Sequence, residues 1–394
     1  MASARFNRKT FEKEIGKITQ ELEQKIALFG TPVENVNDDE IEVDVTPNRP
    51  DLLSYQGFKR SFLSFIGKTS GLKNFKIESP LKDYKVIIDS SVKDVRPYTV
   101  CAIVKGINFT DENIKEVIDI QEKLHTTVGR RRKKLAIGVY PLEKITLPIT
   151  FKALEPDKIK FIPLESDRVM NGLEILQRHP TGRDYASLLA GKSKFPIFVD
   201  AKGEILSMPP IINSELTGRV TNETKDVFIE CSGSDFNSLK KCLNILVTAL
   251  SDMGGKIYSM ELVGAPEKIS PNLDSDKMKI SIENTNKTLG LNLTEKEIKE
   301  NLEKMGHNYN KGIVEIASYR TDVLHEIDLI EDVAIAYGYD KFEPIIPEIS
   351  TIGQEDPRET FKRKISDILS GLGYLETSNY HLTTKVDQFT RWEF

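Results

Sequence analysis

The sequence has few cysteines and no long apolar segment. Its 394 residues contain only three cysteines, Cys101, Cys231 and Cys242, and their spacing is not that of metal ligands. We therefore expect reduced thiols and a cytoplasmic protein. The apolar stretches have the length of strands, and the first residues lack the apolar core of a signal peptide. The sequence thus predicts no membrane span.

Several catalytic motifs are also missing. There is no Gly-x-x-x-x-Gly-Lys-[Ser/Thr] loop, no Cys-x-x-Cys, no His-Glu-x-x-His and no Gly-x-Ser-x-Gly. The sequence therefore predicts no phosphate-binding loop for a nucleotide, no zinc site and no serine nucleophile of these known types. The net charge of -5 argues against a general attraction to nucleic acid, so any such binding must come from local basic patches.

The composition that is present is typical of a folded, multidomain protein. Hydrophobic residues make up 39% and charged residues 29%, as in soluble globular proteins. A length of 394 residues predicts two to four domains. Strand and helix patterns both occur along the chain, so we expect a multidomain α+β fold. The domain boundaries predicted from the sequence are 1–80, 84–268, 272–346 and 352–394.

Local patterns predict individual elements. Apolar residues alternate with polar ones at 40–46, which predicts a strand, and a second strand is expected at 226–232. Thr294-Glu-Lys-Glu297 has the pattern of a capping box that opens a helix. A helix is expected at 325–336, and a further strand at 378–383.

Four carboxylates close in sequence form a candidate metal site. They are Asp322, Asp328, Glu331 and Asp332. If 325–336 is helical, the last three lie at i, i+3 and i+4 on one face. Repulsion makes such a cluster unfavourable unless something positive lies on it, and Mg²⁺ suits carboxylate oxygens. A solvated helical face is the alternative that the pattern leaves open.

A second candidate site combines a polar loop with a polar strand face. The segment 206–221 places two prolines before a loop dense in hydrogen-bonding groups. Close behind it, Glu230 and Ser232 are two residues apart on a predicted strand and so share one face. A carboxylate there suits recognition of a substrate hydroxyl. A network of capping and turn hydrogen bonds is the structural alternative.

One dense basic run is a candidate for phosphate binding. It consists of Arg130, Arg131, Arg132, Lys133 and Lys134. Five adjacent cations can bind a nucleic-acid backbone, and a solvated loop is the other interpretation.

Four separated motifs resemble the β-subunit family of phenylalanyl-tRNA synthetases, in its archaeal and eukaryotic-cytosolic form. Three of them are Asp44-Val-Thr-Pro-Asn-Arg-Pro-Asp-Leu-Leu53, Ser207-Met-Pro-Pro-Ile-Ile-Asn213 and Phe228–Asp235. The fourth is the acidic run, with Tyr319-Arg320 before it and Tyr337-Gly-Tyr339 after it. The motifs occur in collinear order over essentially the whole chain.

The resemblance implies a class II aminoacyl-tRNA synthetase that charges tRNA(Phe) with phenylalanine using ATP. It implies an (αβ)2 heterotetramer in which the α subunit carries the aminoacylation site. The β subunit would hydrolyse tyrosine wrongly attached to tRNA(Phe). The four predicted domains would then be an N-terminal module, an editing and tRNA-binding domain, a helix-turn-helix-like domain with the acidic site, and the beginning of a catalytic-like antiparallel domain.

The resemblance also implies roles for particular residues. Glu230 is similar to the family's editing-site acid, which recognises the tyrosine hydroxyl, and Ser207, Ser232 and Phe198 are expected around the same pocket. An oriented water is the expected nucleophile. The four acids match the family's Mg²⁺ positions, where the ion is shared with the α subunit.

Two departures from the family leave alternatives open. The chain is shorter than the family's usual subunit, so we expect a C-terminal truncation or a fragment. Tyr140-Pro141 stands where relatives often have His-Asp, and no role is assigned there. The alternatives are a free-standing deacylase that edits in trans and a non-enzymatic tRNA-binding or assembly protein.

Overall fold

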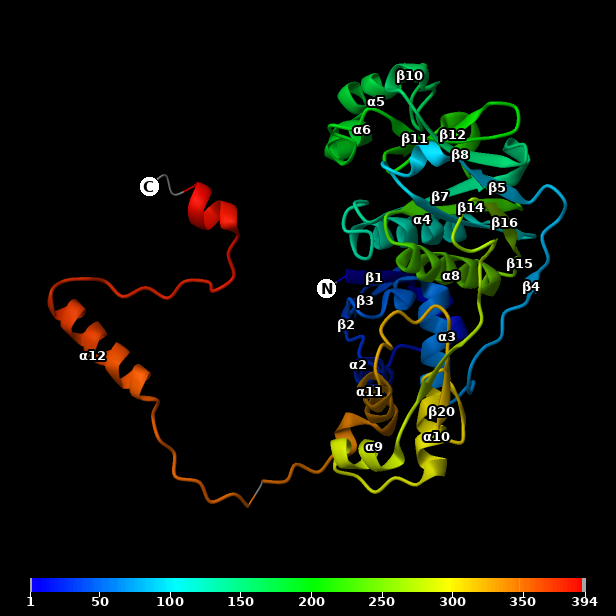
Figure 1. Ribbon diagram of the computed structural model, residues 1–394. Coiled ribbons are helices and arrows are strands. Elements are labelled where there is room, and N and C mark those ends of the chain that lie inside the picture. The colour runs from blue at the N-terminus through cyan, green and yellow to red at the C-terminus, as the bar shows by residue number, and fades with distance from the viewer. Residues whose placement is uncertain (1, 347, 392–394) are drawn as a thin grey trace. The chain divides into compact units, whose positions relative to one another are not determined.

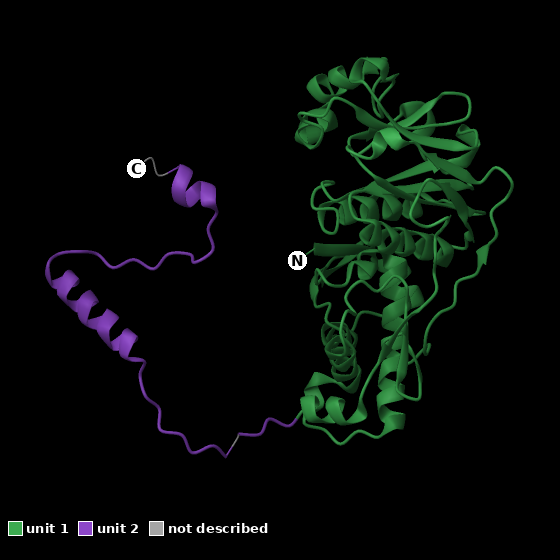
Figure 2. Ribbon diagram, in the orientation of Figure 1, with its two compact units in different colours: residues 1–342 green, residues 343–394 purple. Residues whose placement is uncertain are grey.

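The computed structural model describes residues 2–346 and 348–391. The chain divides into two compact units, residues 1–342 and 343–394 (Figure 2). Along the first unit, three groups of elements follow one another from blue to orange in Figure 1. Within the described residues, no helix has both the length and the apolar character that a membrane crossing requires.

The first group is a small sheet covered by helices. Its strands have the order β1-β3-β2 and are all antiparallel. Its elements are β1 (Ala2–Asn7), α1 (Arg8–Glu14), α2 (Gln20–Leu28), β2 (Val33–Val36), β3 (Glu40–Val45) and α3 (Tyr55–Phe65). The strand predicted at 40–46 is therefore confirmed, and its alternation buries Ile41, Val43 and Val45 against the rings of Phe58 and Phe62.

The second group begins with a five-stranded sheet of order β4-β15-β6-β14-β7. Its strands are β4 (Ile77–Glu78), β15 (Lys256–Tyr258), β6 (Tyr98–Lys105), β14 (Val227–Gly233) and β7 (Leu135–Pro141). The strand predicted at 226–232 is confirmed as β14, which pairs antiparallel with β6 on one side and with β7 on the other. Every residue of β14 is buried, so polar side chains on it lie in the interior.

A seven-stranded mixed sheet packs near this first sheet. Its order is β13-β12-β11-β8-β5-β16-β17, with β5 parallel to both of its neighbours. The strands are β5 (Lys85–Ile88), β8 (Ile149–Leu154), β11 (Phe195–Val199), β12 (Ile205–Met208), β13 (Ile212–Asn213), β16 (Met260–Val263) and β17 (Ile269–Ser270). A two-stranded sheet is formed by β9 (Lys160–Phe161) and β10 (Met170–Asn171).

Helices and the seven-stranded sheet cover opposite faces of the five-stranded sheet. In Figure 1, α4 (Asp111–Thr126) and α8 (Phe236–Asp252) lie on one side of β14, and β8 and β12 lie on the other. Shorter helices follow the sheet strands: α5 (Gly172–Arg178), α6 (Pro180–Tyr185) and α7 (Glu215–Gly218). Successive residues of β14 point to alternate faces. Because Phe228 contacts Tyr140, whose hydroxyl reaches Ser207 of β12, the face bearing Phe228 and Glu230 lies toward the seven-stranded sheet.

The third group has three strands and three helices. Its sheet has the order β18-β20-β19, with β18 (Asp276–Lys279), β19 (Asn308–Asn310) and β20 (Ile313–Ile316). The helices are α9 (Ile282–Leu289), α10 (Glu295–Lys304) and α11 (Glu326–Tyr337). Thr294 and Glu297 form the predicted capping box at the start of α10. The helix predicted at 325–336 is confirmed as α11.

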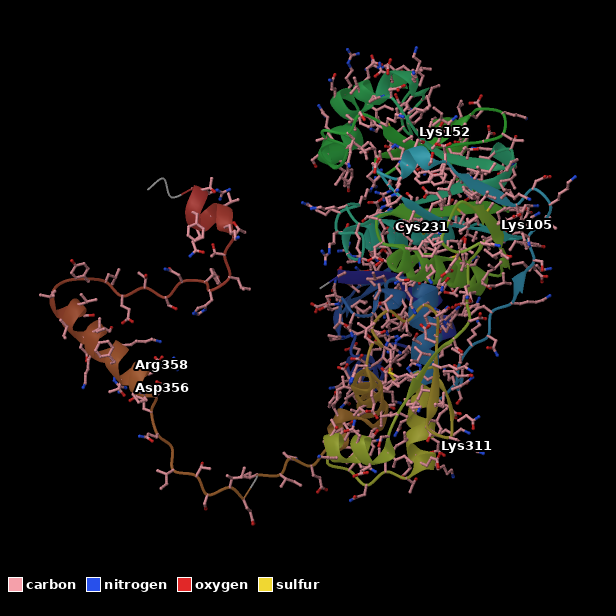
Figure 3. All side chains as sticks on the ribbon, in the orientation of Figure 1. Lys105, Lys152, Cys231, Lys311, Asp356 and Arg358 are labelled. Carbon is pink, nitrogen blue, oxygen red and sulfur yellow. The ribbon has the colours of Figure 1, made fainter. Side chains whose placement is uncertain are left out.

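The second unit contains one long helix and a short π-helical segment. The helix α12 (Pro357–Gly371) begins where Asp356 accepts a hydrogen bond from the backbone of Arg358 (Figure 3). The π-helical segment is Val386–Thr390. The strand predicted at 378–383 is wrong, since residues 378–383 form no strand. Apolar β-like residues need a partner strand and a surface to cover, and these residues are exposed.

Candidate functional site

Glu230 is a buried carboxyl in the middle of the five-stranded sheet. It lies on β14 opposite Cys101 of β6 and Gly138 of β7, and is 1% exposed. Oε1 lies 3.3 Å from the Tyr140 hydroxyl, whereas Oε2 is buried without a partner among the described residues. Burial raises the pKa of Glu230 to about 8, against the opposing effect of the buried Arg96 guanidinium.

Tyr140 connects the polar groups of the two sheets. Its hydroxyl lies 2.8 Å from Ser207 Oγ on β12 and 3.3 Å from Asn213 Oδ1 on β13. Tyr140 itself is completely buried. Burial and the neighbouring Glu230 raise the pKa of the phenol well above its ordinary value, so the phenol remains a hydrogen-bond donor. The predicted pair Glu230 and Ser207 is therefore brought together, through a residue to which no role was assigned.

Ser232 is held by a buried arginine. Arg96 donates to Ser232 Oγ at 3.0 Å from Nε and to the Ser232 carbonyl at 2.5 Å from Nη2. Burial lowers the pKa of Arg96 to about 10, and the charge of Glu230 partly restores it. The sequence contained no signal for Arg96, because it lies in the loop before β6 and 136 residues from its partner.

Phe198 forms part of the wall between the sheets. It pairs with Ser207 across β11 and β12, and its ring stacks on Phe151 with centroids 4.4 Å apart. Both rings are completely buried. Phe198 is therefore next to the polar cluster in the fold, but its ring packs within the seven-stranded sheet.

A cavity of about 650 Å³ lies at the edge of β7 and reaches Glu230. Its wall is formed by α4, by Ile137 and Val139 of β7, and by residues 209–213, which include β13. Arg132 and Glu122 lie at this wall and bond to each other at 2.7 Å. Ser207, Ser232 and Phe198 do not contribute to the lining.

The cavity wall contains one histidine, whose two ring nitrogens are both engaged. The Ile137 backbone N–H donates to His125 Nε2 at 2.8 Å, and Nδ1 lies 3.1 Å from Glu122 Oε1. This pattern fits a neutral ring that donates from Nδ1. Burial lowers the pKa of His125. The ring therefore has no free nitrogen with which to take a proton from water.

Two of the four acidic residues form ion pairs with one arginine. Arg320 donates to both Asp322 oxygens, at 2.8 and 2.7 Å, and to Asp332 Oδ2 at 2.8 Å. His307 Nε2 lies 2.7 Å from the same Asp332 oxygen. The Arg320 guanidinium and His307 hold the pKa of Asp332 well below its ordinary value, even though burial acts in the opposite direction.

The other two acids have different surroundings. Asp328 Oδ2 accepts from the backbone N–H groups of Leu324 and His325 and so caps the start of α11. Glu331 is exposed, and burial together with Asp332, Asp328 and Asp322 raises its pKa. Among the described residues, no three His, Cys, Asp or Glu side chains are grouped so that they could hold a metal ion.

The basic run forms a turn with left-handed backbone. Arg130, Arg131 and Arg132 have φ angles of 49°, 55° and 62°, which non-glycine residues seldom adopt. Arg130, Arg131 and Lys133 are exposed, whereas Arg132 turns inward and donates to the Ile211 carbonyl at 2.9 Å. Lys134 forms an ion pair with Asp235 at 3.0 Å. The run thus contains three exposed cations with no hydrogen-bond or ion-pair partner among the described residues and two that hold the fold.

The third group of elements identifies the class of protein. The family described as "tRNA synthetase B5 domain" matches residues 278–339, which include β20, α10 and the acidic residues of α11. Residues 278–339 therefore resemble a domain of aminoacyl-tRNA synthetases.

Comparison over the whole chain identifies the family. The phenylalanine–tRNA ligase beta subunit of Archaeoglobus fulgidus is 41% identical over 386 residues, which cover 96% of this chain and 70% of that protein. The corresponding subunit of Thermococcus onnurineus is 39% identical over 349 residues, which cover 87% of this chain and 60% of that protein. The chain belongs to the phenylalanine–tRNA ligase beta-subunit family, archaeal type.

A solved structure shows the same fold. An N-terminal fragment of the phenylalanyl-tRNA synthetase β-subunit from Pyrococcus horikoshii is 36% identical, with a TM-score of 0.80. The match covers 85% of this chain and 99% of that fragment. The predicted family and the multidomain α+β class are thus confirmed.

Proposed function

We propose that this chain acts as the β subunit of a cytoplasmic phenylalanine–tRNA ligase. It joins an α subunit in an (αβ)2 heterotetramer that charges tRNA(Phe) with phenylalanine using ATP, and it hydrolyses mischarged Tyr-tRNA(Phe). Family membership supports the first role. The observation that carries the second is the free, buried Oε2 of Glu230 at the end of the cavity.

A buried carboxyl without a partner can distinguish tyrosine from phenylalanine. Tyrosine brings a hydroxyl that satisfies Oε2, whereas phenylalanine leaves this buried oxygen unpaired. Leaving a buried polar group unpaired costs about 1–3 kcal/mol, and sites built to bind a substrate hydroxyl discriminate strongly against the analogue that lacks it. Glu230 is therefore a recognition group, and it need not take part in bond breaking.

The proposed nucleophile is a water molecule, because the nearby side chains are poorly suited to attack. Cys101 lies opposite Glu230, and burial raises its pKa well above the ordinary value, so that it remains a thiol. Ser207 accepts a hydrogen bond from Tyr140, and the neighbouring His125 has both nitrogens engaged. Water attack on the ester carbonyl would release tyrosine and regenerate the tRNA hydroxyl.

We also propose that Mg²⁺ binds at the acidic residues and is shared with the α subunit. Two of the four carboxylates are neutralised by Arg320, and a third caps α11, so the set fits a metal only in part. Glu331 has no such partner among the described residues, and its pKa is raised by burial and by the neighbouring carboxylates, whose negative charge a hard cation would relieve. Glu331→Gln should reduce the Mg²⁺-dependent thermal stabilisation of the αβ complex, with Glu343→Gln as the control. Equal stabilisation of both variants would contradict the proposal.

The exposed cations of the basic run are proposed to contact the tRNA backbone. Arg130, Arg131 and Lys133 are exposed on one turn, which is the property that phosphate binding requires.

The deciding experiment measures both activities of the chain co-expressed with an α subunit. Glu230→Ala should lose Tyr-tRNA(Phe) hydrolysis and keep phenylalanine charging, while Glu204→Ala, on an exposed turn, serves as the control. Retained hydrolysis in Glu230→Ala would overturn the recognition role. Hydrolysis by the chain without α would indicate a deacylase that acts in trans. Charging without any hydrolysis would indicate an assembly subunit.

A further inference from the structure

The phenol of Tyr140 already occupies one side of Glu230. Its hydroxyl lies within hydrogen-bonding distance of Ser207, Asn213 and Glu230, at 2.8, 3.3 and 3.3 Å. Its ring is completely buried and lies 5.7 Å from the Phe228 ring. Glu230 and Ser207 are the groups proposed to surround a substrate tyrosine. The chain thus places a tyrosine side chain of its own among them.

A glycine creates the slot that the Tyr140 ring fills. Gly138 lies two residues before Tyr140 on β7, on the same face of the sheet, and directly opposite Glu230. A Cβ atom at position 138 would lie 2.2 Å from the Tyr140 hydroxyl oxygen and 2.6 Å from the ring carbon that bears it. The ring therefore lies against the bare backbone of Gly138, in space that any other residue would take.

The two oxygens of Glu230 consequently differ in what they offer a ligand. Oε1 receives the Tyr140 hydroxyl, while Oε2 has no partner among the described residues and Glu230 lines the cavity at the β7 edge. One side of the carboxyl is filled by the chain itself, and the other remains available. On the filled side, Ser207, Asn213 and Glu230 surround the phenol hydroxyl.

We propose that Tyr140 is a specificity-determining residue. Its phenol ring occupies the position in this pocket where the phenol ring of a substrate tyrosine would bind. The inference rests on the proposed hydrolysis of Tyr-tRNA(Phe). A tyrosyl ester can place its ring against Gly138 only when Tyr140 leaves the slot, so Tyr140 limits the hydrolysis of that ester. Removing Tyr140 takes the phenol hydroxyl away from Glu230 and Ser207. The hydroxyl of a substrate tyrosine can then take its place.

The test measures hydrolysis of Tyr-tRNA(Phe) and Phe-tRNA(Phe) by the full chain, with and without an α subunit. Tyr140→Ala opens the slot, and Tyr140→Leu retains more of the buried volume if the alanine variant fails to fold. Tyr55→Leu is the matched control, because Tyr55 is also buried and its hydroxyl bonds to Glu14 at 2.8 Å. We expect kcat/KM for the tyrosyl ester to rise about tenfold or more in the Tyr140 variants, with little change for the phenylalanyl ester.

A binding measurement separates this inference from the proposed hydrolysis. p-Cresol, which is the tyrosine side chain as a free molecule, should bind the full-length Tyr140→Ala or Tyr140→Leu chain about tenfold more tightly than toluene. That preference should disappear when Glu230→Ala is added, and it should be smaller in the wild-type chain than in the Tyr140 variants.

Each outcome decides between the two claims. Increased tyrosyl hydrolysis in the Tyr140 variants supports both. Hydrolysis that is unchanged or reduced in them, when the wild type is active, overturns the role of Tyr140 alone. If no variant hydrolyses the ester, the proposed activity fails, and the p-cresol preference then decides whether Tyr140 fills a phenol site. Equal binding of p-cresol and toluene would overturn that assignment as well.

Discussion

Arg320 Nη2 lies 2.8 Å from Asp332 Oδ2 in a buried part of the third group of elements. The same carboxyl oxygen lies 2.7 Å from His307 Nε2, and His307 is completely buried. Asp332 is therefore a counter-charge of the buried Arg320 and a hydrogen-bond partner of the buried His307. Asp332 therefore stabilises the fold at the acidic site whether or not a metal binds there.

Replacing Asp332 should destabilise the protein severely. Asp332→Asn removes the charge and leaves the buried Arg320 with one ion-pair partner, Asp322, among the described residues, so we expect the free energy of unfolding to fall by about 3–5 kcal/mol. Urea unfolding followed by circular dichroism measures the change. Glu331→Gln, one residue away but exposed, should change stability by less than about 0.5 kcal/mol. Similar losses in the two variants would contradict the structural role.

The stability of the protein should depend on the ionisation of Glu230. Its pKa is about 8 in the folded protein against an ordinary value of 4.5, so its contribution to stability is complete below pH 4.5 and is lost as pH rises through 8. Glu230→Gln removes that loss. At pH 8.5 the variant should be more stable than the wild type by roughly 3–5 kcal/mol. The attraction between Arg96 and ionised Glu230, which the variant lacks, reduces this difference.

Urea unfolding of both proteins at pH 5 and pH 8.5 measures this difference. The groups nearest Glu230 do not titrate in that range, because the pKa values of Tyr140 and Cys101 are raised well above ordinary. Glu116, whose pKa burial raises to about 7, titrates in both proteins and cancels in the comparison. A stability difference that stays constant between the two pH values would show that Glu230 is not desolvated.

Gly138→Ala should push Tyr140 out of its slot. The new Cβ would lie 2.2 Å from the Tyr140 oxygen, so the ring must move within a packed interior, at a cost of about 1–3 kcal/mol. Combined with Tyr140→Leu, the change should cost at least about 1 kcal/mol less than the two single changes added together. A double-mutant cycle from thermal unfolding measures this coupling. Additive effects would mean that the ring already has space to move.

Charge reversal in the basic run should weaken tRNA binding selectively. Arg130→Glu with Arg131→Glu alters two exposed cations and should lower affinity for tRNA and reduce the salt dependence by about two phosphate contacts. Lys311→Glu, another exposed cation at positive φ, is the control and lies in the third group of elements (Figure 3). Filter binding at several salt concentrations distinguishes them, and equal losses would indicate only an effect of total charge.

Arg132 should behave differently from its neighbours. Its guanidinium donates to the Ile211 carbonyl and to Glu122, so Arg132→Gln removes contacts that hold the loop after β12. We expect a loss of about 1–2 kcal/mol in the free energy of unfolding, with no change in the salt dependence of tRNA binding. Thermal unfolding and binding on the same samples provide both readouts. A reduced salt slope without destabilisation would place Arg132 with the phosphate contacts.

Local patterns in the sequence determined several elements of the fold. Alternation at 40–46 predicted β3, a strand was also predicted at 226–232, where β14 lies, and the capping box at Thr294 predicted the start of α10. Two residues on one strand share a face regardless of the rest of the chain, so Glu230 and Ser232 could be placed together. The prediction at 378–383 failed because a strand also needs a partner, and local sequence does not supply one.

Only the tertiary structure decided how the polar groups are paired. Tyr140 meets Ser207 across 67 residues because two sheets face each other there, and Arg96 meets Ser232 across 136 because β6 and β14 are neighbours in one sheet. The four acidic residues are close in sequence, but three of them have different structural roles. Arg320 forms ion pairs with Asp322 and Asp332, and Asp328 caps the start of α11. Periodicity along one strand or helix fixes which residues share a face, whereas the identity of the facing element depends on packing between distant segments. The sequence by itself thus determined the family and the candidate acid, and packing determined that a tyrosine of the chain already bonds to it.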